Sequence, residues 1–332
     1  MKFGPVPLSA AEGAVLAHSV GLARGRLRKG RVLTAADLAA LAEAGLEEVI
    51  VARLDPGDVG ENAAAEALAA AVLGNGTGLK TTAPFTGRVN LIAEAPGVAA
   101  LDVAALDAVN AVDPMITIAT VPPWQQMAAG GMVATIKIIS YAVGKTALDR
   151  AIAAAGGGAV SLETPKLRSA TLIITEIPGG VGDKGARAIE DRLRALDVSL
   201  GQIVMVPHAE APLRDAIAGV TEDLVLILTG SATSDPDDVA PSAVRSAGGR
   251  VERFGMPVDP GNLLFIGDVQ GKPVIGLPGC ARAPALNGAD WVLSRVICGV
   301  PVSSADIAGM GVGGLLKEIP TRPQPRQGRA KG

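Results

Sequence analysis

One stretch of the chain, residues 223–247, decides the fold and reads DLVLILTGSATSDPDDVAPSAVRSA. Its beginning, Asp223 to Leu228, is short and almost continuously apolar, which is typical of a strand buried on both faces of a parallel sheet. A loop rich in hydroxyl and carboxylate groups follows. Val239 to Ala247 then predicts a helix with Pro241 in its first turn. The stretch therefore predicts a strand, a loop and a helix in succession.

The same alternation extends in both directions from this stretch. Further strands are predicted at Thr171–Thr175, Gln202–Val206 and Arg250–Phe254, and further helices at Gly185–Leu196 and Ala211–Ala218. A hairpin of Leu263–Asp268 and Pro273–Gly276 and a helix from Pro284 to Ile297 complete the series. Alternating strands and helices with doubly buried strands predict an α/β fold: a doubly wound, mostly parallel, three-layer α/β/α domain.

The preceding part of the chain predicts an irregular α+β region. Thr34 and Asp37 form a capping-box pattern that opens a helix ending at Gly45, and Glu48–Ala52 follows as a strand. An alanine-rich segment, residues 58–74, predicts a second helix. The longest uncharged stretch, residues 114–136, contains prolines, glutamines and glycines, so two buried strands around a turn are expected rather than a membrane span.

Three regions are predicted on this basis. They are an α+β region at 1–168, the α/β domain at 169–300 and a C-terminal extension at 301–332, whose basic, proline-rich tail after Ile319 is expected to be disordered.

Composition narrows the class of protein. The chain has 332 residues, 48% of them hydrophobic, so a packed globular protein is expected. A formal charge of −3 and only 2% aromatic residues argue against nucleic acid as a partner. Two cysteines and two histidines leave no zinc-type cluster, and the N-terminal residues lack the features of a signal peptide. We expect a cytoplasmic protein that does not cross a membrane.

Three loops follow predicted strands, where ligands bind in open α/β sheets. In the first, Ile177–Gly185, the residues Gly180, Gly182 and Gly185 match the G-x-G-x-x-G pattern of a dinucleotide-binding turn. A nicotinamide-dependent oxidoreductase is one hypothesis from this match. Because three residues separate the glycines from the strand, a plain flexible connection is the other interpretation.

The second and third loops contain side chains suited to phosphate. In the second, Leu228–Asp238, hydroxyls and backbone N–H groups can bind a phosphate or a polar heterocycle, and a carboxylate can hold Mg²⁺. Helix capping is the alternative interpretation of the same residues. In the third loop, Gly276–Gly279 turns sharply before Arg282, which suits bidentate phosphate contact or, alternatively, a surface position.

Together, these loops resemble the molybdopterin-binding domain shared by the molybdopterin adenylyltransferases and molybdotransferases. Thr229–Thr233 and Asp238–Ser242 fall without a gap on the pattern T-G-G-T-G, four residues, D-V-T-P-E, and Gly276–Gly279 matches the start of G-L-P-G-N-P. Asp183-Lys-Gly185 resembles the D-x-x-G segment, and Pro207-His208-Ala209 stands where the family has a P-D-D turn. The resemblance covers residues 170–299, and Ala11–Ala17 is similar to the start of molybdotransferases.

The resemblance implies a molybdopterin-binding protein of molybdenum cofactor biosynthesis that transfers an adenylyl or molybdate group. It implies a pterin phosphate as ligand, ATP or molybdate as co-substrate, a molybdoenzyme or pathway protein as partner, and a homo-oligomer. Asp238 would be the catalytic carboxylate and Mg²⁺ ligand. The implied cofactor-binding residues are Thr229, Gly230, Ser231, Thr233, Ser234, Asp235, Gly182, Asp183, Gly185, Pro278, Gly279 and Arg282.

The chain departs from the family pattern at several positions. Ser231 and Thr233 replace glycines, Ala232 replaces a threonine, and Asp259 and Asn262 replace lysines. Losing cations where anions bind favours a second hypothesis, a non-catalytic carrier or maturation factor.

Overall fold

The computed structural model describes residues 1–318, and the chain divides into two compact units. Unit 1 contains residues 1–95, 99–123 and 129–162, whereas unit 2 contains residues 96–98, 124–128 and the chain from Glu163 onward. The tail predicted to be disordered lies outside the described residues. Within the described residues, no helix has the length and apolar character needed to cross a membrane.

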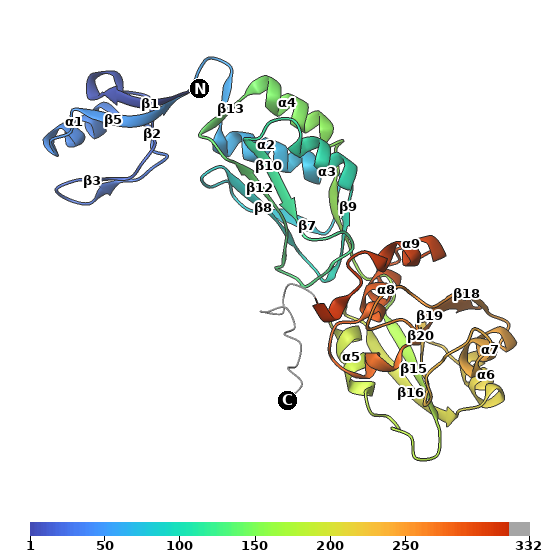
Figure 1. The fold of residues 1–332 in the computed structure, drawn as a ribbon. Coiled ribbons are helices and arrows are strands. Elements are labelled where there is room, and N and C mark those ends of the chain that lie inside the picture. Colours follow the sequence, from blue (N-terminus) through green and yellow to red (C-terminus); the bar gives the residue numbers. More distant parts are fainter. Residues whose placement is uncertain (319–332) are drawn as a thin grey trace, which may run out of the picture. The chain divides into compact units, whose positions relative to one another are not determined.

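A six-stranded sheet forms the centre of unit 2 (Figure 1). Four neighbouring strands run parallel, and the last two strands extend the sheet in antiparallel pairing. In order across the sheet, the strands are β16 (Ser199–Pro207), β15 (Ser169–Glu176), β17 (Leu224–Leu228), β20 (Lys272–Leu277), β19 (Phe265–Val269) and β18 (Arg250–Phe254).

Helices cover both faces of this sheet, as Figure 1 shows. Residues Leu224, Leu226 and Leu228 of β17 belong to the core on one face, while Val225 and Ile227 belong to the core on the other. Because both sets are fully buried, the continuous apolar strand is explained by this three-layer packing. The helices of the unit are α5 (Ala186–Arg194), α6 (Glu210–Ala218), α7 (Val239–Ser246), α8 (Gly288–Ile297) and the short α9 (Ser304–Ala308).

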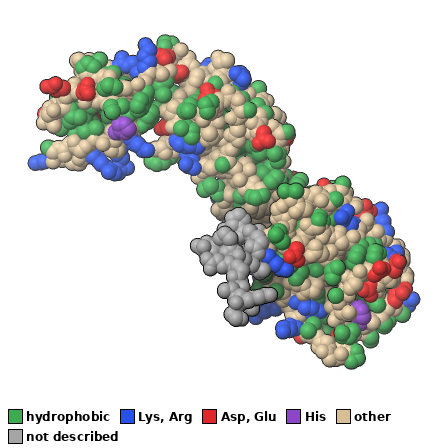
Figure 2. Space-filling model, in the orientation of Figure 1, with side chains coloured by type: hydrophobic (Ala, Val, Ile, Leu, Met, Phe, Trp, Pro, Cys, Tyr) green, Lys and Arg blue, Asp and Glu red, His purple; other side chains and the backbone are tan. Residues whose placement is uncertain are grey.

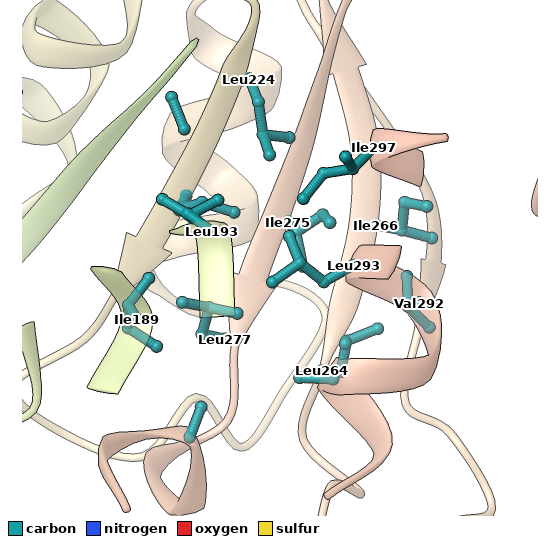
Figure 3. Packing of buried hydrophobic residues seen from close by; sticks show 14 of the residues in the cluster. Ile189, Leu193, Leu224, Leu264, Ile266, Ile275, Leu277, Val292, Leu293 and Ile297 are labelled. Carbon is teal, nitrogen blue, oxygen red and sulfur yellow. The ribbon is translucent and has the colours of Figure 1, made fainter. Parts of the chain in front are cut away.

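The first of these cores is formed by the sheet with α5 and α8. Figure 3 shows Leu193 of α5 and Leu293 of α8 directed toward the strand residues Ile275 and Leu277. On the other face, Leu213 of α6 and Val244 of α7 pack against the sheet. The predicted α/β class and doubly wound, mostly parallel arrangement are confirmed.

The structure corrects the starts of two predicted helices. The helix expected at residues 58–74 begins at Glu61, because Asp58–Gly60 form strand β6. The last helix was expected from Pro284, but α8 begins at Gly288, where Asn287 and Asp290 form a capping box. Ala283 instead has an extended backbone (φ −93°, ψ 150°), and the carbonyl groups of Ala283 and Ala285 accept hydrogen bonds from Arg192, which holds this segment outside the helix.

Unit 1 is the irregular α+β region that the sequence predicts. Its largest sheet is antiparallel and has the order β10-β12-β8-β7, and a smaller sheet has the order β1-β5-β2. The strands of these sheets are β1 (Lys2–Pro7), β2 (Val15–Leu16), β5 (Glu48–Arg53), β7 (Leu79–Thr81), β8 (Arg88–Ala93), β10 (Ile116–Thr120) and β12 (Met132–Ile138). The helices are α1 (Ala35–Glu43), α2 (Glu61–Leu73), α3 (Val103–Asn110) and α4 (Lys145–Ala154).

Short strands complete the chain. The two-stranded pairs are β3 (Val20–Gly21) with β4 (Arg26–Leu27) and β6 (Asp58–Gly60) with β13 (Ala142–Gly144), and a three-stranded sheet contains β9 (Gly97–Leu101), β11 (Gln126–Met127) and β14 (Val160–Glu163). The uncharged stretch 114–136 forms β10, β11 and the start of β12 rather than a long helix. The predicted capping box of α1 is present, with Thr34 as the N-cap and Asp37 as its partner.

Candidate pterin-phosphate site

Three loops of unit 2 leave one edge of its sheet. They follow β15, β17 and β20, which are neighbours and run parallel, so their carboxyl ends lie together. The loops contain residues 177–185, 229–238 and 278–287. They are the three loops that the sequence singled out.

Arg282 joins these loops. Its Nη2 donates to the carbonyl oxygen of Thr229 over 3.0 Å, and its Nη1 donates to the carbonyl oxygens of Lys184 (2.6 Å) and Gly182 (3.4 Å). Burial lowers the pKa of Arg282, but a guanidinium remains charged at neutral pH. A guanidinium has five N–H groups, so two remain beyond these three bonds. Arg282, which the sequence predicts to bind phosphate, therefore uses most of its N–H groups to hold the loops together.

Two glycines allow the loops to approach one another. At Gly185, where φ is +101°, a Cβ atom would lie 2.6 Å from the Cβ of Arg282. At Gly230, a Cβ atom would lie 2.6 Å from the carbonyl oxygen of Thr175. Neither position has room for a side chain, so both glycines are required by packing.

A hydroxyl group links the second loop to the end of β16. The buried Thr175 accepts a hydrogen bond at Oγ1 from the backbone N–H of Gly230 over 3.0 Å, and its Oγ1 lies 2.8 Å from Nδ1 of His208. The Gly230 bond leaves the hydroxyl proton free to donate to Nδ1. His208, at the position of the family's P-D-D turn, thereby supports the glycine turn through Thr175.

The second loop is ordered by its own polar groups. Both oxygens of Asp238 accept backbone N–H groups, Oδ1 from Val239 (2.7 Å) and Oδ2 from Ser234 (3.1 Å), and Asp238 is the N-cap of α7. Asp235 accepts the N–H of Asp237. The capping interpretation is thus satisfied, while each carboxylate oxygen of Asp238 keeps a second lone pair.

Thr233 turns its side chain into the second loop. Its side chain is 7% exposed, and its hydroxyl lies 3.3 Å from the hydroxyl of Thr229. Ser231, by contrast, is exposed. Of the two residues that replace family glycines, only Ser231 therefore presents its side chain to solvent.

The third loop is held from α5. Arg192 donates to the carbonyl oxygens of Ala281, Ala283 and Ala285 and forms an ion pair with Asp290 at 2.5 Å. Burial raises the pKa of the neighbouring Cys280 thiol, which disfavours a reactive thiolate. This loop is therefore a rigid support rather than a source of a nucleophile.

Open backbone remains on two of the loops. A Cβ atom at Gly179, Gly182 or Gly279 would meet no heavy atom within 4 Å. A phosphate group can approach such backbone closely, because no side chain stands between it and the N–H groups. The site therefore combines open backbone with the Arg282 guanidinium.

Some of the predicted site residues contact one another in the structure, and others are exposed on the loops. Arg282 bonds directly to Gly182 and Thr229, and Gly185 lies against Arg282. Pro278 is buried within the sheet edge, whereas Asp183, Ser234 and Asp235 are exposed on the loops. Three supporting residues were not predicted as site residues, namely Thr175, His208 and Arg192. His208 had a signal in its position on the family pattern, but the other two had none.

The donor set also bears on Mg²⁺. Among residues 1–318, no group of three or more His, Cys, Asp or Glu side chains is arranged to hold a metal ion. Mg²⁺ commonly uses one or two carboxylates together with substrate phosphates and water. A single carboxylate such as that of Asp238 is compatible with that pattern.

Comparison with known proteins finds a related family over much of unit 2. Residues 165–296 match the family described as a probable molybdopterin binding domain. The matched residues include the six-stranded sheet and the three loops described above. Residues 5–53 match a domain of unknown function, DUF8806. No curated protein matches the chain.

Solved structures with similarity to the chain include three proteins named for molybdopterin or molybdenum cofactor biosynthesis. The molybdopterin biosynthesis MoeA protein from Pyrococcus horikoshii has 14% identity and a TM-score of 0.32, covering 90% of this chain and 75% of that one. The molybdopterin biosynthesis enzyme MoaB from Thermus thermophilus has 15% identity and a TM-score of 0.26, covering 39% and 89%. A molybdenum cofactor biosynthesis protein B has 15% identity and a TM-score of 0.30, covering 41% and 96%.

Proposed function

We propose that the molybdopterin-binding domain of this chain binds molybdopterin at the three loops and serves molybdenum cofactor biosynthesis. The observation that carries the proposal is Arg282, which joins all three loops beside open glycine backbone at the ends of parallel strands. The pterin phosphate would contact the backbone of Gly182 and Gly279 and the two remaining N–H groups of Arg282. Thr229 and Ser231 would face the rest of the ligand.

Two forms of this function differ in chemistry. In the first, the domain transfers an adenylyl group from ATP to the phosphate of the bound pterin and releases pyrophosphate, or it transfers molybdate to the bound pterin. Asp238 is the carboxylate that would hold Mg²⁺ against a phosphate. Mg²⁺, when bound there, supplies positive charge that stabilises the transferring phosphoryl group.

In the second form, the protein carries molybdopterin and presents it to a molybdoenzyme or another pathway protein. Two observations favour this form. Three of the five N–H groups of Arg282 already bind carbonyl oxygens. Asp259, where the family has a lysine, is paired with Lys317 at 3.0 Å. Few N–H donors of Arg282 then remain for a second anion, and the charge of Lys317 is offset by Asp259, whereas transfer requires a second anion to be held.

Binding is tested first, with the full chain and purified molybdopterin under reducing, oxygen-free conditions. A ligand that binds only the folded state raises apparent stability, so saturating molybdopterin is expected to raise the melting temperature of unit 2. Because both tryptophans, Trp124 and Trp291, belong to unit 2, their fluorescence reports its unfolding. NADH serves as the comparison ligand. Stabilisation by NADH without stabilisation by molybdopterin contradicts the proposal and favours the dinucleotide interpretation of Gly180–Gly185.

A further inference from the structure

A second candidate site lies in unit 1, apart from the residues discussed above. A cavity of about 290 Å³ is lined by Lys29, Glu61, Arg88, Lys137, Ile139 and Tyr141, among others. A groove of about 390 Å³ adjoins it, because Lys29 and Gly30 line both hollows. Arg26, Arg28 and Arg31 complete the groove.

The charge of the cavity is positive. Glu61 pairs with Lys137 at 3.7 Å, and Lys137 also donates to the carbonyl oxygen of Thr86. Arg88 donates to the neutral hydroxyl of Thr135. Among residues 1–318, no carboxylate forms an ion pair with Lys29 or Arg88, so their charges are not neutralised.

The groove adds further positive charge. Residues 24–31 read RGRLRKGR, and Arg31 alone of these cations is paired, with Asp37, among the described residues. Figure 2 shows Lys and Arg side chains gathered on this face of unit 1, around the β3–β4 hairpin. Several cations in a row suit a ligand whose negative charges also follow one another, such as a polyphosphate chain.

An aromatic ring forms another part of the lining. Tyr141 stacks on Phe3, with ring centroids 6.4 Å apart and planes 12° apart, and its hydroxyl donates to the carbonyl oxygen of Ala17 over 2.5 Å. Burial, with a smaller contribution from Glu61, raises the pKa of Tyr141, so the ring stays neutral. Ile139 lines the same cavity. A fixed ring beside an aliphatic side chain suits a planar heterocycle.

We propose that this basic cavity of unit 1 binds a nucleoside polyphosphate, with its base against Tyr141 and its phosphates along Lys29, Arg88 and the groove. Ligand pockets commonly measure roughly 300–1,000 Å³. The cavity and the groove together reach that range. The site is independent of the molybdopterin loops, since all of its residues belong to unit 1.

Calorimetric titration of the full chain at low salt, with ATP and with inorganic tripolyphosphate, tests this assignment. ATP is expected to bind saturably and more tightly than tripolyphosphate. The double variant Lys29→Ala with Arg88→Ala should weaken ATP binding at least tenfold. The matched control, Lys80→Ala with Arg150→Ala, removes two exposed cations of unit 1 that line neither hollow and should leave ATP affinity unchanged.

The same titration separates the alternatives. An ATP affinity that is unchanged in the Lys29/Arg88 variant would place the bound ATP outside this cavity, for example in unit 2, and would overturn the proposal. Equal losses in the control variant would mean nonspecific attraction to net charge. Tripolyphosphate affinity equal to that of ATP would overturn the contact with Tyr141, and Tyr141→Phe should preserve the preference for ATP. Unchanged circular dichroism of each variant shows that it is folded.

Discussion

The guanidinium of Arg282 donates to the carbonyl oxygen of Thr229 over 3.0 Å, joining the loop after β20 to the loop after β17. The same side chain reaches the carbonyl oxygens of Gly182 and Lys184 in the loop after β15. One residue thus fixes the relative positions of three loops that no strand pairing holds. The shape of the candidate site depends on this contact as much as its charge does.

Replacing Arg282 with lysine keeps the positive charge but removes the planar fork that reaches all three carbonyl groups. Arg282→Lys is expected to destabilise unit 2 by about 1.5–3 kcal/mol, the value of a hydrogen bond to a charged group. Urea unfolding followed by tryptophan fluorescence measures this change. Arg187→Lys, an exposed position on α5, is the control and should have no effect. A lysine variant as stable as the native protein would show that the carbonyl bonds do not hold the loops.

Replacing Thr175 tests whether its hydroxyl group supports the shape of the site. Thr175→Val keeps the shape of the side chain but leaves the N–H of Gly230 without its partner, which is expected to cost about 1–3 kcal/mol. Molybdopterin affinity should fall in parallel, because the glycine turn loses its anchor. Thr175→Ser restores a hydroxyl and should recover both properties. Recovery of stability without recovery of affinity contradicts the role assigned to Thr175.

The central strands and the loops were predictable because their signals are local. The continuous apolar run at Leu224–Leu228 requires burial on both faces, and the spacing from Thr229 to Asp238 matches a family pattern. Contacts between distant segments left no such signal. Thr175 looks like any β-branched strand residue, and the bonds of Arg192 to Ala283 and Ala285, about 90 positions away, displaced the predicted helix start.

The buried position of the Thr233 side chain could not be predicted from the sequence either. A threonine in a polar loop gives no indication of which way its side chain points, and only the three-dimensional contact with Thr229 decides this. Because its side chain is buried, Thr233 leaves the surface of the loop free even though it replaces a family glycine.

Asp37 gives unit 1 a specific dependence on pH. Hydrogen bonds from Arg31 and Thr34 hold the pKa of Asp37 at about 2, below the value of about 3.9 in unfolded chains. Because the folded pKa is the lower one, the stabilisation is fully present above pH 4 and is lost as the pH falls through 2. Asp37→Asn should therefore lower hydrogen-exchange protection of α1 at pH 7 and make little difference near pH 2. A carboxyl pKa near 4 for Asp37 in an NMR titration would contradict the assignment.

Asp238 distinguishes a metal ligand from a helix cap. Asparagine is also a favoured N-cap, so Asp238→Asn should retain the fold and much of the pterin affinity. Any Mg²⁺-dependent transfer activity should fall roughly 10²-fold, as when one electrostatic group is removed from a transition state. Asp237→Asn, at an exposed carboxylate of the same loop that is not among the implied cofactor-binding residues, is the matched control and should retain activity. Unchanged turnover in the Asp238 variant would leave this residue with capping alone.

Ser231 and Thr233 separate an enzyme from a carrier, and the structure assigns them different effects. Ser231 is exposed, so its side chain stands where the ligand is expected to touch the backbone. Removing it in Ser231→Gly should allow closer approach. Transfer requires reacting atoms within about 3–3.5 Å, so closer approach should raise any transfer rate more than it raises affinity.

Thr233→Gly should lower stability without raising the transfer rate. Thr233 is buried and contacts the hydroxyl of Thr229, so its removal leaves a small void and a lost hydrogen bond, at a cost of about 1 kcal/mol, with no gain in access. The native protein is expected to retain molybdopterin while transferring adenylyl groups slowly or not at all. Transfer by the native protein at about 1 s⁻¹ or faster, an ordinary enzymatic rate, would contradict the carrier form. Equal gains in rate from both glycine variants would contradict the inward position of Thr233, because a buried side chain cannot obstruct a ligand at the surface.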